Sequence, residues 1–224
     1  MHGGMLALTA TDLQVLHGLF NKAAKRRYYG TPIKTEFSNE IAIRLIIGCV
    51  SFVAGRLDIS FKPLFIDHDM HYYRTYLKIL NTPEQEENIG YIIFCRNCKD
   101  RYANILKQTK CRKCRHETEI AGPLWIGKLF DKDFVVKMKD VKNDLVVHKR
   151  CERILDRSES EAELPATYYT LDEIASRMNS APLKLSDAIE KLTSNGFMAS
   201  MTSLNPSGFR TDCEIDEIIQ IFQS

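Results

Sequence analysis

Four cysteines in the middle of the sequence have the type and spacing of metal ligands. Cys95 and Cys98 form one C-x-x-C pair, Cys111 and Cys114 form a second, and twelve residues separate the pairs. Each pair presents two thiolates in one tight turn, and two such turns supply the four sulfurs of a tetrahedral zinc site. Protein sulfurs fill all four positions, so the predicted zinc is structural and not catalytic. An iron-sulfur cluster and unoccupied thiols are the alternatives that this spacing leaves open.

The segment around the cysteines is strongly basic. Residues 91–130 hold nine Lys or Arg against three acids, a local net charge of +6. Phosphate binding needs such a surplus, although a solvated surface that offsets thiolate charge has the same composition. An earlier cluster combines four bases with Tyr28 and Tyr29, a mixture that suits single-stranded or distorted RNA. The candidate RNA-binding residues are Lys22, Lys25, Arg26, Arg27, Arg96, Lys99, Arg112, Lys113 and Arg115.

Two further clusters of polar residues admit both a chemical and a structural interpretation. The stretch "DHDMH" at 67–71 could ligate a metal, but a turn between two strands uses the same residue types. Glu36, Glu40 and Arg44 have helical spacing and could be a carboxylate pair with an anchor. Acids in the first turn of a helix and an i,i+4 salt bridge give the same pattern, and we favour this interpretation.

The elements before the cysteines resemble the end of an α/β sheet. A strand is expected near Met5–Thr9, a helix over residues 13–29, and a buried helix over 40–54. Two alternating stretches at 58–66 and 71–80 predict strands, and Pro63 places the first at an edge or a bulge. The order strand, helix, helix, strand, strand predicts the closing third of an open α/β sheet.

The remainder of the chain is expected to contain three further parts. A polar linker at 81–88 leads into the cysteine module, and charged residues 131–160 are helical in character. A second linker, "SESEAELP", precedes a helix-turn-helix and strand-turn-strand pattern, which predicts a winged-helix domain. Residues 165–224 carry a net charge of −4, so a packing or RNA-docking role is favoured over reading of duplex DNA. The predicted divisions are 1–80, 81–130, 131–164 and 165–224.

Composition limits where the chain works. The 224 residues have a formal charge of +2, and the longest apolar run, 41–54, is too short to span a bilayer and contains Arg44. The N-terminus lacks the pattern of a secretory signal. We therefore expect a cytoplasmic protein that does not bind membranes.

The order of several stretches resembles one family, the tRNA (guanine-26-N2) dimethyltransferases. These stretches are "GGMLALTATD", "RRYYGTPIKTEFSNEIAIRLIIG", "DHDMHYYRTYLKIL", the cysteine pairs, "AGPLWIGKLFD" and "LNPSGFRTD" followed by "EIDEII". Asn39 is a departure, because the family usually has histidine there. The resemblance implies an S-adenosylmethionine-dependent enzyme that methylates a guanine exocyclic amine in tRNA. It implies an α/β or α+β fold: the closing third of a Rossmann-like methyltransferase sheet, then a zinc ribbon and a C-terminal winged-helix domain.

The resemblance also predicts that the cofactor-binding half lies outside this chain. No G-x-G-x-x-G loop and no Asp-Pro-aromatic motif occurs in the sequence, so no catalytic or cofactor-binding residue is assigned. Thr9, Thr11 and Asp12 could line the edge of a pocket or cap the next helix. We expect the chain alone to be inactive and to bind tRNA, as the C-terminal portion of an enzyme that is truncated, split, or partnered with a separate chain carrying the N-terminal half. The alternative is a non-enzymatic zinc-ribbon and winged-helix protein that binds nucleic acid.

Overall fold

The chain divides into two compact units in a computed structural model. Unit 1 comprises Met1–Asp131 and unit 2 comprises Lys132–Ser224. The structure describes residues 3–82, 88–142 and 146–223. Most of the linker predicted at 81–88 lies outside these residues, and the four-part division stays a prediction.

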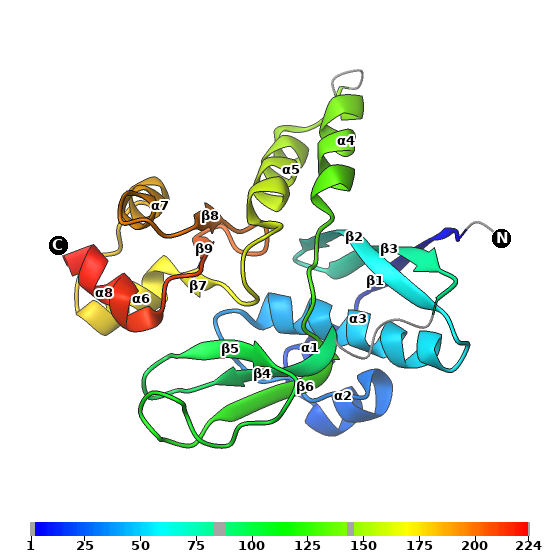
Figure 1. Ribbon diagram of the computed structural model, residues 1–224, viewed down its shortest axis with the longest axis horizontal. Coiled ribbons are helices and arrows are strands. Elements are labelled where there is room, and N and C mark those ends of the chain that lie inside the picture. Colours follow the sequence, from blue (N-terminus) through cyan, green and yellow to red (C-terminus); the bar gives the residue numbers. More distant parts are fainter. Residues whose placement is uncertain (1–2, 83–87, 143–145, 224) are drawn as a thin grey trace. The chain divides into compact units, whose positions relative to one another are not determined.

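The first sheet of unit 1 is antiparallel throughout. It consists of β1 (Met5–Ala10), β2 (Ser60–Asp69) and β3 (Tyr72–Leu80) in the order β1-β3-β2 (Figure 1). Both neighbours of β3 run against it. The register shifts between Pro63 and Phe65, which confirms the edge or bulge position predicted from the proline. The two strand predictions at 58–66 and 71–80 are confirmed.

Three helices follow or support this sheet. The single helix expected over 13–29 is wrong: α1 (Leu13–Leu16) ends before Gly18, and α2 (Asn21–Tyr28) begins after it. Gly18 has a φ of +81°, a conformation that breaks a helix and suits glycine. The buried helix expected at 40–54 is confirmed as α3 (Ser38–Gly55).

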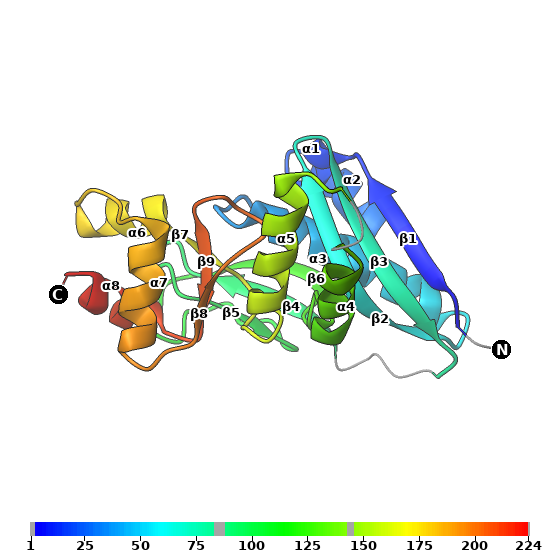
Figure 2. The same cartoon turned by 90° about the horizontal axis from the view of Figure 1, so that it is seen from above.

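Helix α3 forms the core that two sheets share. It is long and apolar enough to cross a membrane by composition, yet Ile41, Ile43 and Leu45 are fully buried inside unit 1. One side packs against β2 and β3, and another packs against β4 (Ile89–Phe94) and β6 (Glu119–Trp125) (Figures 1 and 2). These contacts are those of a core helix.

The second sheet carries the cysteine segment. Its order is β5-β4-β6, with β5 (Arg101–Asn104) at one edge and antiparallel pairing on both sides of β4. Trp125, at the end of β6, is 4% exposed and its ring lies 5.4 Å from that of Phe61. This tryptophan is therefore a core residue of unit 1.

Unit 2 begins with two helices. These are α4 (Lys132–Lys142) and α5 (Lys149–Glu161), as the charged composition predicts. The linker expected at "SESEAELP" is wrong in its first half, because α5 continues through Glu161. Ser158 and Glu161 are buried, so this stretch packs as part of a helix.

The remaining elements of unit 2 form a small antiparallel sheet with helices. In chain order they are β7 (Tyr169–Thr170), α6 (Leu171–Met178), α7 (Leu185–Ser194), β8 (Ala199–Met201), β9 (Gly208–Thr211) and α8 (Ile215–Gln223). The sheet order is β7-β9-β8. Thr170 and Glu173 form a capping box at the start of α6.

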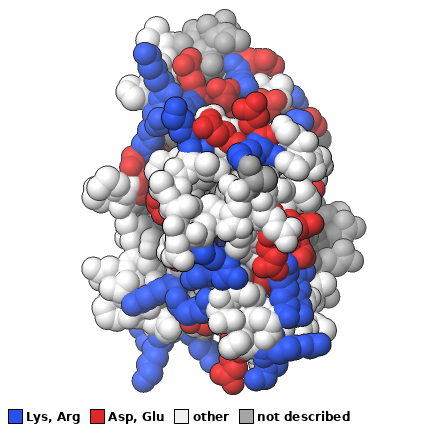
Figure 3. Space-filling view, turned by 90° about the vertical axis from the view of Figure 1, so that its left-hand side faces the viewer, with Lys and Arg blue, Asp and Glu red and all other residues white. Residues whose placement is uncertain are grey.

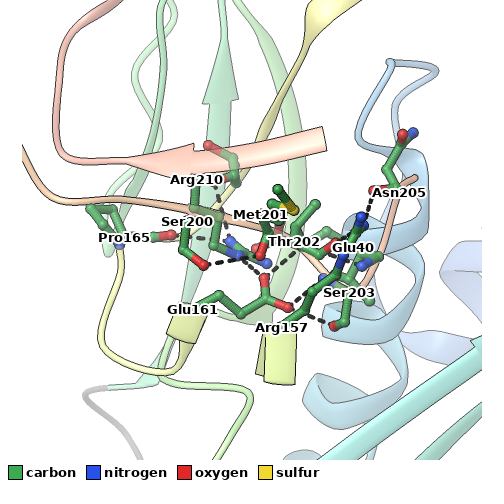
Figure 4. A network of polar contacts seen from close by, with 12 residues as sticks. Glu40, Arg157, Glu161, Pro165, Ser200, Met201, Thr202, Ser203, Asn205 and Arg210 are labelled. Carbon is green, nitrogen blue, oxygen red and sulfur yellow. Dashed lines mark hydrogen bonds and ion pairs between the residues drawn. The ribbon is translucent and has the colours of Figure 1, made fainter. Parts of the chain in front are cut away.

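A buried carboxylate connects α5 to this sheet. Glu161 forms an ion pair with Arg210 at 2.5 Å, and the exposed fractions of the two side chains are 0% and 2% (Figure 4). Glu161 also accepts hydrogen bonds from Thr202 Oγ1 at 2.6 Å and from the backbone and hydroxyl of Ser203. These bonds compensate for burying the charge.

The fold class predicted from the sequence is wrong. The described residues form three separate three-stranded antiparallel sheets with helices, where the closing third of a Rossmann-like sheet was expected. Neither a winged-helix domain nor a zinc ribbon is established by these elements. The strand and helix signals located most elements, but they did not determine the pairing of the strands.

Candidate functional site

The two cysteine pairs lie in turns of the same geometry. Cys95 follows β4, its amide donates to the carbonyl of Asp100 at 2.9 Å, and its carbonyl accepts from Lys99. In the second turn the amide of Cys111 donates to His116, and its carbonyl accepts from Arg115. Lys99 and Arg115 both have left-handed φ values, of 64° and 63°. Each pair is therefore held by a backbone loop that points both thiols inward.

The turns bring all four sulfurs together. The Sγ atoms of Cys95, Cys98, Cys111 and Cys114 all lie within 4.8 Å of one another. The Cys95–Cys114 distance is 3.4 Å and the Cys98–Cys111 distance is 3.5 Å. Sulfurs about 2.3 Å from a tetrahedral zinc ion lie roughly 3.8 Å apart, so this arrangement fits such an ion.

The surroundings of the four thiols act on their protonation in opposite directions. Burial raises the pKa of Cys95 and that of Cys98. A hydrogen bond from the backbone of His116 is the main cause that lowers the pKa of Cys114 to about 5. A metal ion requires all the thiols in their deprotonated form, so binding would release protons from the buried pair.

All three acidic residues of the basic segment, residues 91–130, pair with basic residues of the same segment. Arg96 forms a forked contact with Glu119, Arg112 forms a forked contact with Asp100 at 2.9 and 3.0 Å, and Lys110 lies 3.9 Å from Glu117. Asp100 is 2% exposed, so its pair with Arg112 holds the first cysteine turn near the second. Arg96 and Arg112 therefore stabilise the segments that carry the two cysteine turns. The RNA-binding role predicted for both residues is separate from this contribution.

The other candidates in this segment differ in exposure. Arg115 is exposed, while Lys99 and Lys113 are half-buried. The ammonium of Lys99 lies 5.5 Å from the centre of the Phe94 ring. The structure thus places the five candidates around the cysteine turns, with Arg115 the most open to a ligand.

Arg101 is one of the nine bases counted in residues 91–130, but its burial was not predicted from the sequence. Arg101 is 5% exposed, and its guanidinium lies 4.6 Å from the Phe37 ring and 5.3 Å from the Phe94 ring. Phe37 immediately precedes α3, so Arg101 connects the cysteine segment to the core helix. Its charge looked like part of the basic surface, and no local spacing marks it as buried.

The second basic cluster lies on α2. Lys22, Lys25, Arg26 and Arg27 are all exposed. Arg27 is paired with Asp12 at 2.6 Å. Within the described part of the chain, the other three make no ion pair. The two clusters belong to the same unit.

The remaining polar candidates have structural roles. Arg44 binds Glu40 at 2.8 Å, and both side chains are buried, which confirms the expected i,i+4 salt bridge. The "DHDMH" stretch comprises the last three residues of β2 and the two-residue turn into β3. Asp67 accepts from Tyr72, and Asp69 accepts from the amide of Met70. Among the described residues, this stretch does not bring three possible ligand atoms together.

The polar candidates at the end of β1 and directly after it bind other residues of the chain. Thr9 accepts a hydrogen bond from Arg74 at 3.0 Å, and Asp12 pairs with Arg27. Asp12 occupies the N-cap position of α1 without a side-chain capping bond, so the capping interpretation is wrong. No fit to a cofactor follows from these contacts.

The charges of the face shown in Figure 3 are mixed. Basic side chains lie in separate groups, and acidic side chains and broad uncharged areas lie between them. The concentrated positive charge of the chain is in residues 22–27 and 91–130 of unit 1.

The comparisons with known proteins agree along the whole chain. A family model described as N2,N2-dimethylguanosine tRNA methyltransferase matches residues 1–223. A tRNA (guanine(26)-N(2))-dimethyltransferase from Methanosphaera stadtmanae is 30% identical over 98% of this chain and 59% of its own length. A tRNA (guanine(26)-N(2)/guanine(27)-N(2))-dimethyltransferase from Aquifex aeolicus is 30% identical over 97% of this chain and 57% of its own length.

A solved structure shows the same fold. Trm1 from Pyrococcus horikoshii, in complex with S-adenosyl-L-methionine, aligns with a TM-score of 0.85 at 24% identity. The alignment covers 98% of this chain and 59% of that one. The chain thus spans about three fifths of the length of the relatives that it matches, and the alternative of an unrelated nucleic-acid-binding protein is not favoured. The chain belongs to the N2,N2-dimethylguanosine tRNA methyltransferase family.

Proposed function

We propose that this chain takes part in the S-adenosylmethionine-dependent methylation of a guanine exocyclic amine in tRNA. The observation that carries the proposal is the family match over residues 1–223. The relatives are named for dimethylation of guanine in tRNA, and the solved neighbour was determined with S-adenosyl-L-methionine. Since the chain spans only part of their length, the activity of the whole protein is inferred for it and not observed. A cytoplasmic location is proposed on the same grounds.

The contribution we assign to this chain is binding of tRNA through unit 1. The exposed bases Lys22, Lys25 and Arg26 on α2, and Arg115 beside the cysteine turns, offer positive charge to phosphates. Arg27, Arg96 and Arg112 already pair with acids, so we expect them to contribute less. Lys99 and Lys113 complete the proposed surface.

We propose that the four cysteines hold a structural zinc ion. The close approach of the four sulfurs and the matching backbone loops support this assignment. When bound, the ion would cross-link the turn after β4 to the turn before β6 and fix the basic residues that flank the thiols. Because thiolates would fill all four positions, we assign the ion no part in methyl transfer.

No residue of this chain is assigned to S-adenosylmethionine. Thr9, in β1, binds Arg74, and Asp12, just after β1, binds Arg27. We therefore derive no chemical step through the cofactor from this chain. Residues in a separate chain remain the proposed source of that pocket.

Methyl transfer from labelled S-adenosylmethionine to unmodified tRNA tests the proposal. The chain is assayed alone and with the N-terminal part of the Aquifex aeolicus relative added in trans, and nucleoside digests are searched for N2-methylguanosine. Transfer in either arm supports the proposed function, and transfer in the second arm alone assigns the cofactor pocket to a separate polypeptide. Absence of both transfer and tRNA binding would contradict it.

A further inference from the structure

One face of α2 carries three cations and ends in an exposed tyrosine. Lys22, Lys25 and Arg26 are spaced i, i+3 and i+4, so they lie on one side of the helix, and Tyr29 is the C-cap residue that directly follows its last turn. All three cations are exposed, and Tyr29 is 42% exposed. We call Lys22, Lys25, Arg26 and Tyr29 the cationic stripe. At 1.5 Å per residue it extends roughly 10 Å along the helix axis. A helix C-terminus favours cations, which explains the bases but not an aromatic ring left open to solvent.

The ring of Tyr29 is supported by the end of α3. The guanidinium of Arg56 lies 5.9 Å from the centre of the ring, and Phe52 meets it edge-on at 5.7 Å. Arg56 is itself exposed. Aromatic rings and arginine planes are the surfaces on which proteins stack unpaired bases.

The backbone at this tyrosine is fixed from both sides. Tyr29 has a φ of 59°, an uncommon conformation for a bulky residue. Gly30 follows it in a tight space, where a Cβ would lie 2.3 Å from the carbonyl oxygen of Pro123. Thr31 then exchanges two backbone hydrogen bonds with Gly122, at 3.0 and 2.9 Å. The ring is thus held in place before any ligand arrives, which lowers the entropic cost of binding.

Tyr28, the neighbouring tyrosine, differs in its environment. It is half-buried, and burial is the first cause that raises the pKa of its hydroxyl. Two adjacent tyrosines therefore have different positions, one turned into the unit and one presented at the end of a cationic stripe.

We propose that Tyr29 is a stacking site for an unpaired nucleobase, with Lys22, Lys25 and Arg26 holding the phosphates of the same RNA strand. This inference rests on the proposed function, because it names the form of RNA that the α2 face takes. The site selects single-stranded or splayed RNA: a paired base within a duplex cannot offer its face to the ring. Arg56 adds a second planar surface beside the tyrosine.

A short single-stranded RNA with one 2-aminopurine tests the proposal with the full chain. Stacking quenches the fluorescence of this base, a signal that mere loss of a structural contact does not reproduce. Wild-type protein and Tyr29→Phe should quench it. Tyr29→Asn should abolish quenching and weaken binding about 5- to 150-fold, the range found for base–aromatic stacking. Asparagine accepts the left-handed conformation, so this variant removes the ring and keeps the backbone turn.

Two controls keep the outcomes distinct. Phe20→Ala removes a ring of 53% exposure from the other end of α2 and should leave quenching unchanged. The fluorescence of Trp125 reports whether each variant folds. Wild-type protein that does not quench the probe, or Tyr29→Asn that quenches as wild type does, overturns the stacking site. Methyl transfer and tRNA binding are measured separately. Loss of quenching with both intact overturns the stacking site alone, whereas absence of both transfer and tRNA binding contradicts the proposed function.

Discussion

The guanidinium of Arg44 and the carboxylate of Glu40 form an ion pair inside unit 1, with an Nε–Oε1 distance of 2.8 Å. Their exposed fractions are 3% and 0%. Arg44 also donates to the carbonyl oxygens of Trp125, at 3.1 Å, and of Gly127, at 2.8 Å. One side chain of the core helix thereby binds the backbone at the end of β6 and one carboxylate oxygen of the buried acid together.

Removal of one member of this pair should destabilise unit 1. Arg44→Met removes the buried cation that pairs with Glu40, a change that typically costs about 3–5 kcal/mol of unfolding free energy. Urea unfolding followed by Trp125 fluorescence measures the change. Arg27→Ala breaks the more exposed pair with Asp12 and should cost less than about 1 kcal/mol. Equal losses from the two variants would contradict the role assigned to burial.

The cysteine cluster should contain about one zinc ion per chain. Cys98→Ser and Cys111→Ser should each lose most of this zinc, because three sulfurs hold the ion less tightly than four. Cys213→Ser is the matched control, since Cys213 is 3% exposed and lies in the core of unit 2. Metal content by mass spectrometry gives the answer. Full zinc retention in Cys98→Ser would rule out this centre.

Unit 2 should depend on its own buried ion pair. Arg210→Met removes the buried cation that pairs with Glu161, and we expect a cost of about 3–5 kcal/mol. Hydrogen exchange of β8 and β9 reports this loss by faster labelling. Lys139→Met, which breaks partly exposed contacts with Asp156 and Glu159, should leave exchange in these strands nearly unchanged. Unaltered exchange in Arg210→Met would show that the pair does not hold the sheet.

The stability of unit 1 should fall in mild acid through His17. Burial is the main cause that lowers the pKa of His17, and the nearby His68 lowers it further. As the pH falls to about 6.5, His17 binds a proton in the unfolded chain but stays neutral in the folded chain. The contribution of neutral His17 to the unfolding free energy is therefore complete above about pH 6.5 and is lost as the pH falls toward the pKa of His17 in the folded state.

Replacing this histidine tests the assignment. His17 contacts the hydroxyl of Tyr73, which donates to Asn39 at 2.7 Å, so His17→Gln keeps a polar partner for the tyrosine. The unfolding free energy of the variant should change less between pH 7.5 and 5.5 than that of the wild type. The same pH dependence in both proteins would assign the effect to other groups.

The sequence predicted local elements and close ligands better than long-range pairing. The C-x-x-C spacing and the Thr170–Glu173 box act through neighbouring residues, so each could be recognised from a few positions. The antiparallel partners of β3 could not, because pairing depends on contacts between distant segments. The break at Gly18 was missed because the apolar spacing continues across it.

Burial of charged residues was also hidden from the sequence. Arg101 and Arg210 have the same letter as the exposed Arg26 and Arg115, and only their surroundings separate a core cation from a phosphate ligand. The number of bases in residues 91–130 does not show which of them pair with Asp100, Glu117 and Glu119. Three bases form these pairs, so fewer cations are available to bind RNA phosphates.

Binding of unmodified tRNA at several salt concentrations tests the central claim most directly. Wild-type protein should bind tRNA more tightly than duplex DNA of equal charge, with affinity falling as salt rises. Lys22→Gln, Lys25→Gln and Arg26→Gln combined in one variant should make the slope of log K against log salt shallower by about 2. Equal affinity for duplex DNA, with a slope that the triple variant does not change, would contradict the assignment of this chain to tRNA binding.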